Sequence, residues 1–172
     1  MGLTDDEGTF LSLVVRLEPA TAYQLSKVYA DSPVSNFGTS KGKIYPLIRR
    51  LRDRGLIKSS QVQGDGRGSE QLSSTNLGRD AARRWVSDIR ESHLLLEDPL
   101  RTKVQSFGLL SRDQQLAWIA KVRSELRAKL AEVDAYGAEV SVPYKEQVHD
   151  NAVSSLNARL AWLDRLETAI SA

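Results

Sequence analysis

One stretch, residues 39–68, constrains the fold more than any other part of the chain. Its first half carries apolar residues at the spacing i, i+3, i+4 and i+7 (Ile44, Leu47, Ile48 and Leu51), which predicts a helix with one buried face. The opposite face is basic: residues 41–67 contain eight Lys or Arg and two acids, a net charge of +6, whereas the whole chain carries only +2. A basic helix followed by a glycine-rich loop indicates a surface for a polyanion.

Length and composition exclude several classes of protein. With 172 residues the chain can form one large domain or two small ones, each with a core. It has no cysteine, which excludes disulfides and thiolate metal sites. It has no apolar run of about 18 residues and begins with acidic rather than basic residues, so we expect neither a membrane-spanning helix nor an export signal. These features predict a cytoplasmic protein.

The order of the elements around this stretch predicts a winged helix-turn-helix. Thr4 with Glu7 and Thr21 with Gln24 have the spacing of capping boxes and should start two helices before the basic one. After Gly55 the pattern changes to two short strands, 56–62 and 69–75, joined by a glycine-rich turn. Three helices followed by a hairpin place the third helix in the DNA major groove and the hairpin beside it. The residues expected to face inward from the first, second and fourth helices are Phe10, Leu13, Val14, Leu17, Leu25, Val28, Tyr29, Ala81, Ala82, Trp85, Val86 and Ile89.

The C-terminal third predicts two long amphipathic helices. Ser111 with Gln114 caps the first, which should run to about Tyr136, and residues 137–143 should break it from the last helix. Apolar residues at near-heptad spacing predict an antiparallel coiled hairpin, a kind of seam that commonly pairs subunits. The residues expected to mediate dimerisation are Leu116, Ile119, Leu126, Leu130, Leu156, Leu160, Leu163 and Ile170. The predicted protein is thus mainly α-helical, with a winged helix-turn-helix domain (1–90), a linker (91–111) and a helical dimerisation domain (112–172).

Specific motifs in residues 8–88 resemble the PadR family of bacterial transcriptional regulators. The residues that carry the resemblance are Ala22-Tyr23-Gln24-Leu25, Gly42-Lys43-Ile44-Tyr45-Pro46-Leu47-Ile48-Arg49-Arg50-Leu51, Gly55-Leu56-Ile57, Thr75-Asn76-Leu77-Gly78 and Arg84-Trp85. Residues 99–170 are also similar to the C-terminal domain of the branch that includes the alpha-type virulence activators, through Phe107-Gly108-Leu109-Leu110-Ser111 and Leu160-Ala161-Trp162-Leu163-Asp164.

This resemblance implies a homodimer that binds a palindromic operator in double-stranded DNA, in the bacterial cytoplasm at the nucleoid. Most relatives are repressors and some are activators. The second strand of the hairpin departs from the family, because Glu70, Leu72 and Ser74 stand where aromatic and apolar residues are usual. The departure leaves an alternative function open: a winged-helix protein-interaction module, or a co-regulator with little DNA affinity of its own.

Candidate site residues follow from the basic helix and from the tryptophans. The residues expected to contact DNA are Ser40, Lys41, Lys43, Tyr45, Arg49, Arg50, Arg52 and Arg67. Trp85, Trp118 and Trp162 lie on apolar helix faces and are interpreted mainly as core; the alternative is a pocket for a small aromatic effector. The sequence shows no pairing of a nucleophile with a base, no metal cluster and no phosphate loop, so we expect no catalytic residue, cofactor or metal site.

Overall fold

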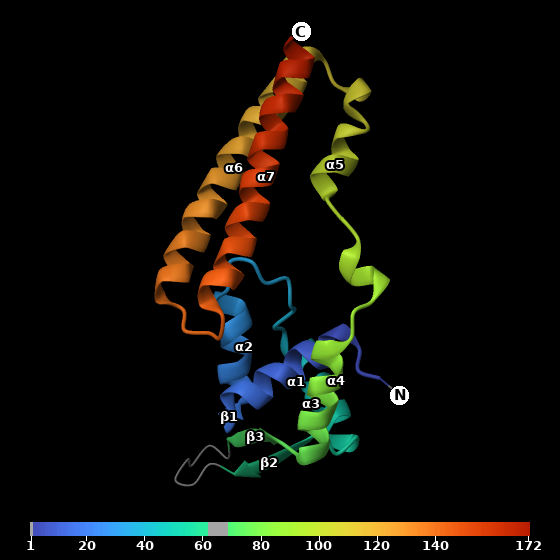
Figure 1. Ribbon diagram of the computed structural model, residues 1–172, viewed down its shortest axis with the longest axis vertical. Coiled ribbons are helices and arrows are strands. Elements are labelled where there is room, and N and C mark those ends of the chain that lie inside the picture. Colours follow the sequence, from blue (N-terminus) through green and yellow to red (C-terminus); the bar gives the residue numbers. More distant parts are fainter. Residues whose placement is uncertain (1, 62–68) are drawn as a thin grey trace. The chain divides into compact units, whose positions relative to one another are not determined.

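The computed structural model describes residues 2–61 and 69–172 of the chain, which divides into two compact units, 1–95 and 96–172 (Figure 1). The first unit comprises α1 (Asp5–Leu17), β1 (Ala20–Thr21), α2 (Ala22–Asp31), α3 (Lys41–Asp53), β2 (Ile57–Gln61), β3 (Glu70–Ser74), α4 (Asn76–Ser87) and the short 3-10 helix η1 (Glu91–Leu94). The second comprises α5 (Pro99–Val104), the 3-10 helix η2 (Phe107–Leu109), α6 (Arg112–Glu139) and α7 (Lys145–Ser171).

The predicted capping boxes start the helices of both units. Thr4 accepts from the Glu7 amide while Glu7 accepts from the Thr4 amide, and Thr21 and Gln24 repeat this exchange. Ser111 and Gln114 cap α6 in the same way. These side chains satisfy amides that have no partner inside the helix, so the sequence located three helix starts correctly.

The sheet has one strand more than the sequence predicted. The predicted hairpin is present as β2 and β3, paired antiparallel with Ser59 opposite Leu72. β1 adds to the other edge of β3, with Ala20 opposite Leu72, so the order is β1-β3-β2. A strand of two residues carries no periodicity, and its pairing depends on tertiary contacts such as the bond from the Ser74 amide to the Glu18 carboxylate.

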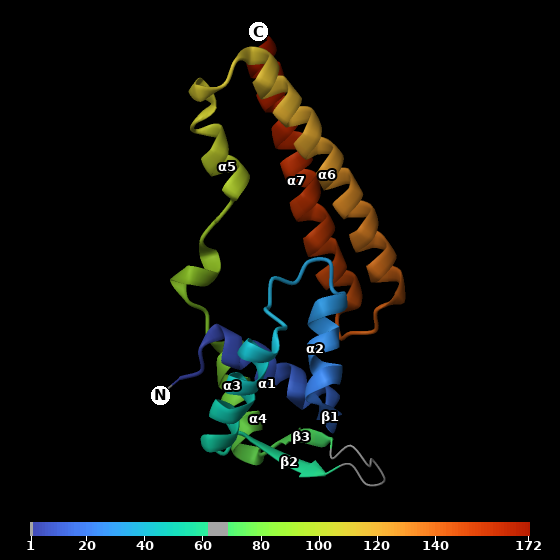
Figure 2. The same ribbon diagram turned by 180° about the vertical axis from the view of Figure 1, so that it is seen from behind.

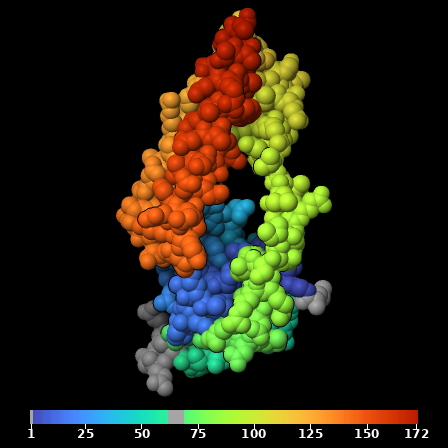
Figure 3. Space-filling model, in the orientation of Figure 1, coloured from blue at the N-terminus to red at the C-terminus, as the bar shows by residue number. Residues whose placement is uncertain are grey.

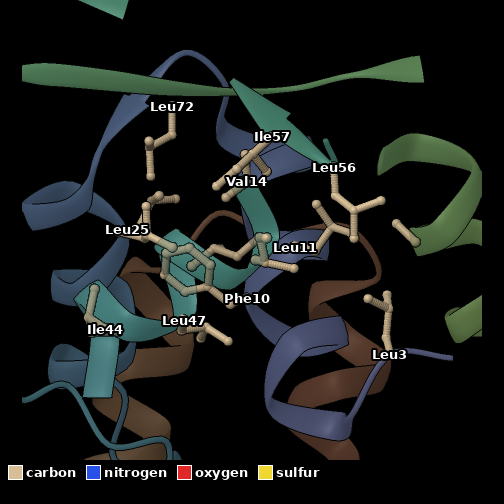
Figure 4. Packing of buried hydrophobic residues seen from close by; sticks show 14 of the residues in the cluster. Leu3, Phe10, Leu11, Val14, Leu25, Ile44, Leu47, Leu56, Ile57 and Leu72 are labelled. Atoms are coloured by element: carbon tan, nitrogen blue, oxygen red, sulfur yellow. The ribbon is translucent and has the colours of Figure 1, made fainter. Parts of the chain in front are cut away.

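The core of the first unit holds α3 by its apolar face. Phe10 of α1 lies at the centre, with Leu25 of α2 and Ile44 and Leu47 of α3 around it (Figure 4). All four residues of the predicted α3 stripe are buried, which confirms that face. The sheet closes the core with Leu72, and α4 adds Ala81 and Ala82.

Three residues predicted to face inward are exposed instead. Leu17 is the last residue of α1, and Val86 and Ile89 lie at and beyond the end of α4, which stops at Ser87. Leu17 and Val86 lie in the last turns of their helices, where the core no longer covers them, and Ile89 lies past the end of α4, so these three assignments were wrong.

The second unit is built on the α6–α7 hairpin. The two helices lie side by side in both ribbon views, and buried residues of α6 (Ile119, Leu126, Val133) pack against Leu156 and Leu163 of α7 (Figures 1 and 2). α6 continues to Glu139, past the predicted end at Tyr136. Gly137 therefore lies inside α6, where α7 approaches closely. A Cβ at this position would lie 2.4 Å from Nδ1 of His149, so the close approach favours a residue without a side chain. None of the described helices is both long enough and apolar enough to span a membrane.

Candidate nucleic-acid interface

The first turns of α1 and α3 differ in charge and in capping, and only that of α3 is basic. α1 begins with three acids, and its cap is satisfied by Thr4 and Glu7. α3 has no acid in its first turn; Lys41 and Lys43 lie there instead, and the Ser40 side chain at the N-cap makes no capping hydrogen bond. Amides at a helix start carry partial positive charge, so the start of α3 attracts phosphate.

The outward face of α3 presents Lys41, Tyr45 and Arg49. All three are exposed, Tyr45 to 57%. Within residues 2–61 and 69–172, neither Lys41 nor Arg49 has an ion-pair partner at 4.0 Å or less. These side chains can therefore meet a partner molecule without first breaking an internal salt bridge.

The other predicted DNA contacts on α3 are engaged within the first unit. Arg52 pairs with Glu70 of β3, with Nη2 and Oε2 3.2 Å apart, which ties α3 to the hairpin. Lys43 pairs with Asp6, and Arg50 pairs with Glu7 of α1. Arg67 lies outside the described residues.

Tyr23 is a candidate contact residue that the sequence analysis does not include. It lies on α2, is 75% exposed, and lines with Tyr45 and Lys41 a hollow of about 380 Å³ between α2 and α3. Tyr23 and Tyr45 also border a second hollow, of about 710 Å³, that reaches Glu70 of β3. The signal was available, because a large aromatic residue two positions before the buried Leu25 must lie on the polar face of its helix.

The predicted dimerisation residues fall into two sets. Ile119, Leu126, Leu156 and Leu163 are buried in the seam between α6 and α7, so they hold the hairpin itself together. The partly buried residues that flank this seam or continue it toward its end are Leu116, Leu130, Leu160 and Ile170. Figure 3 shows α7 along one face of the second unit. Only the partly buried set has apolar surface left for another chain.

The three tryptophans lie in different local surroundings within their own units. Trp85 belongs to the first unit, where it packs on Gly8 and borders a hollow of about 610 Å³. Trp118 meets Phe107 edge-on, with ring centroids 5.0 Å apart, which is a packing role. Trp162 lines a hollow of about 370 Å³ in the second unit together with Asp98, Arg101 and Arg159. Across the described part of the chain, no group of three or more His, Asp or Glu is placed to hold a metal ion.

Comparison with known proteins points to one fold. No family model matches the sequence. Among curated proteins, transcriptional regulator YqjI of Escherichia coli is 20% identical over 127 residues, which cover 74% of this chain and 58% of YqjI. The chain therefore spans less than two thirds of the length of the curated relatives it matches.

Solved structures match over nearly the whole chain. Bacillus subtilis PadR in complex with operator DNA superposes with a TM-score of 0.79 at 20% identity, covering 95% of this chain and 98% of PadR. A PadR-like transcriptional regulator from Bacillus cereus gives 0.77 at 20% identity, with 98% and 97% covered. PadR in complex with p-coumaric acid gives 0.76 at 16% identity, with 96% and 98% covered. The chain has the PadR-like fold, a winged helix-turn-helix followed by a helical hairpin, as its motifs predicted.

Proposed function

We propose that this chain is a sequence-specific DNA-binding transcriptional regulator, acting as a repressor on the bacterial nucleoid. It binds a palindromic operator as a homodimer, with α3 of each subunit in the major groove and the β2–β3 hairpin beside it. The observation that carries the proposal is the outward face of α3. It presents Lys41, in the first turn of a helix whose N-cap side chain makes no capping hydrogen bond, and Arg49, about two turns further along. The fold shared with PadR, which has been crystallised with operator DNA, supports it.

In this proposal the residues of α3 divide the work of recognition. Lys41 and Arg49 neutralise phosphates, which gives affinity irrespective of sequence. Ser40 and Tyr45 reach base edges in the major groove. Tyr23 of α2 borders the same hollow as Tyr45 and extends the contact surface to the neighbouring helix. Arg52, held by Glu70, keeps the hairpin in register with α3.

The hairpin of the second unit provides the dimer contact. Its seam uses one apolar stripe of each helix, and Leu116, Leu130, Leu160 and Ile170 remain only partly buried. Two-fold symmetry of the protein then requires a two-fold operator.

A small aromatic effector is a further part of the proposal. The hollow beside Trp162 contains an indole face for stacking and two arginines that can receive an anionic group, although Arg159 already pairs with Asp98 at 3.1 Å. PadR, which shares the fold, has been crystallised with p-coumaric acid, an aromatic acid.

The test begins by selecting bound fragments from genomic DNA and then measures affinity for the selected fragment against salt. The double variant Lys41→Ala/Arg49→Ala should lower the slope of log K against log salt by about 3.6, since the homodimer loses two phosphate contacts from each subunit and each lost contact removes about 0.9. Arg83→Ala is the matched control, because it removes an exposed arginine whose ion pair within the described part of the chain is with Asp80 of its own helix. Its slope should equal that of the wild type.

Two results would overturn the proposed function. One is affinity that hardly changes with salt; the other is an unchanged slope in the double variant. Failure to retain any fragment against excess competitor DNA would instead favour the protein-interaction alternative that the unusual hairpin strand suggests.

A further inference from the structure

The acidic first turn of α1 contacts both ends of α3. Asp6 pairs with Lys43 in the first turn of α3, with Oδ2 and Nζ 3.0 Å apart. Glu7 pairs with Arg50, with Oε1 and Nε 3.4 Å apart, and with Arg54, with Oε2 and Nη1 2.9 Å apart. Acids at a helix start are common because they complement the helix dipole. These two acids also pair with three basic side chains of α3 and its C-cap, Lys43, Arg50 and Arg54.

The Glu7 side chain is buried and hydrogen-bonded, so it holds these contacts in a fixed position. Its side chain is only 7% exposed, and Oε2 also accepts a hydrogen bond from the Thr4 amide at 3.1 Å as part of the capping box. The carboxylate is thereby fixed to the α1 backbone and shielded from water, so its charge must be balanced by neighbouring cations. Arg50, with more than half of its side chain exposed, reaches inward to this carboxylate.

Lys43 is held in a comparable manner. Besides its pair with Asp6, its Nζ lies 4.8 Å from the centroid of the Phe37 ring, and Phe37 packs against the core residue Phe10. Lys43 therefore joins α1, α3 and the segment before α3, and it is directed at the protein's own surface.

We infer that Asp6 and Glu7 are positioning residues for DNA recognition, which rests on the proposed function. They set the rotation of α3, and hence the direction in which Lys41, Tyr45 and Arg49 are presented. Functional side chains must be held to within roughly 0.5 Å by the residues that support them. The buried apolar stripe fixes which side of α3 faces the core, and we infer that the ion pairs fix the remaining rotation of α3 about its axis. Lys43 and Arg50 thus change role, from phosphate contacts to members of this support.

A positioning role and a phosphate contact have different signatures in binding. A lost phosphate contact weakens operator and non-specific DNA alike and lowers the salt slope by about 0.9. A lost support leaves the number of phosphate contacts unchanged but misdirects the side chains that read bases. It should therefore lower the ratio of operator affinity to non-specific affinity without lowering the slope.

The experiment compares Glu7→Gln, Arg50→Ala and the double variant in the full chain, on a selected operator fragment and a scrambled fragment. Each single variant should lower the affinity ratio by about tenfold, and the double variant should lower it no further than Glu7→Gln alone, because Arg50→Ala removes one of the two ion pairs that Glu7→Gln already weakens. Asp80→Asn, which removes an exposed acid of α4, controls for the change in net charge, and Arg49→Ala provides the phosphate-contact signature. A slope lowered by about 1.8 in Arg50→Ala, one phosphate contact from each subunit of the homodimer, with the affinity ratio unchanged, would overturn the inference.

A second measurement decides the matter without DNA. Amide hydrogen exchange in Glu7→Gln should accelerate in residues 41–53 of α3 more than in residues 22–31 of α2. Equal acceleration in both helices would mean that Glu7 only stabilises the unit as a whole, and would overturn the inference. If the wild-type chain bound no DNA, the proposed function would fall, while the exchange result would still show whether Glu7 holds α3.

Discussion

The two units of this chain bury their apolar residues in different ways. In the first unit, α1, α2, α3, α4 and the sheet close on one core around Phe10 and Leu25, and α3 has its apolar face fully covered. In the second, the core is a single seam between α6 and α7, flanked by partly buried residues such as Leu160. The first unit buries its apolar residues in its own core and exposes charged side chains such as Lys41 and Arg49. The second leaves apolar side chains such as Leu160 partly exposed.

The largest expected difference between the units concerns two buried glycines. A Cβ on Gly78 of α4 would lie 1.9 Å from the backbone oxygen of Leu56, so Gly78→Ala should lower the free energy of unfolding by about 3 kcal/mol or more. The nearest atoms to a Cβ on Gly137 of α6 belong to the His149 side chain, which can shift at the cost of its 3.2 Å contact with Asp134. Because Ala also favours the helix by about 1 kcal/mol, Gly137→Ala should change stability by less than about 1 kcal/mol.

Chemical denaturation of the two variants, followed by circular dichroism, checks this comparison. Equal losses in both would show that α4 can move away from the start of β2, and that the first unit is no more tightly packed than the hairpin.

The next effect tests the apolar surface of the hairpin. Leu160→Gln should raise the dissociation constant of the dimer by about tenfold, since burying a leucine side chain contributes about 1.5–3 kcal/mol and Leu160 is already partly covered. Analytical ultracentrifugation over a concentration series measures the constant. Ala161→Gln, at an exposed position of α7, is the matched control. A dimer that is indifferent to Leu160→Gln would place the subunit contact elsewhere.

The smallest effect is a pH dependence confined to the first unit. Burial raises the pKa of Tyr29 to about 12, while its hydroxyl donates to the Thr9 carbonyl oxygen at 2.9 Å. The unfolded chain releases this proton near pH 10, so the contribution of Tyr29 to stability is complete below pH 10 and is lost as the pH rises toward 12. Tyr29→Phe removes this titration.

Near neutral pH we expect Tyr29→Phe to lower stability by about 1 kcal/mol, the net contribution of one hydrogen bond. The deficit relative to the wild type should shrink between pH 10 and 12, measured by urea unfolding at each pH. A deficit that stays constant over this range would show that Tyr29 ionises at its ordinary pKa.

Local rules accounted for most of the fold. Thr4, Thr21 and Ser111 identified helix starts because a capping box is made by residues three positions apart. The strand β1 was not predicted because two residues carry no pattern. Ile89 was misplaced because a periodic pattern does not show where a helix stops, and Leu17 and Val86 were misplaced because the pattern does not show how far along a helix the core reaches.

What the sequence determined by itself was that α3 has a buried stripe and a basic side. Periodicity of 3.6 residues sorts side chains into faces, and the sorting needs no knowledge of neighbours. What only the tertiary structure decided was which basic side chains of α3 form ion pairs within the protein and which do not. Arg49 and Arg50 are adjacent, chemically identical and both exposed, yet Arg50 pairs with Glu7 whereas Arg49 has no ion-pair partner among the described residues. That division depends on where the first turn of α1 lies, 43 residues earlier in the chain, and no spacing within α3 encodes it.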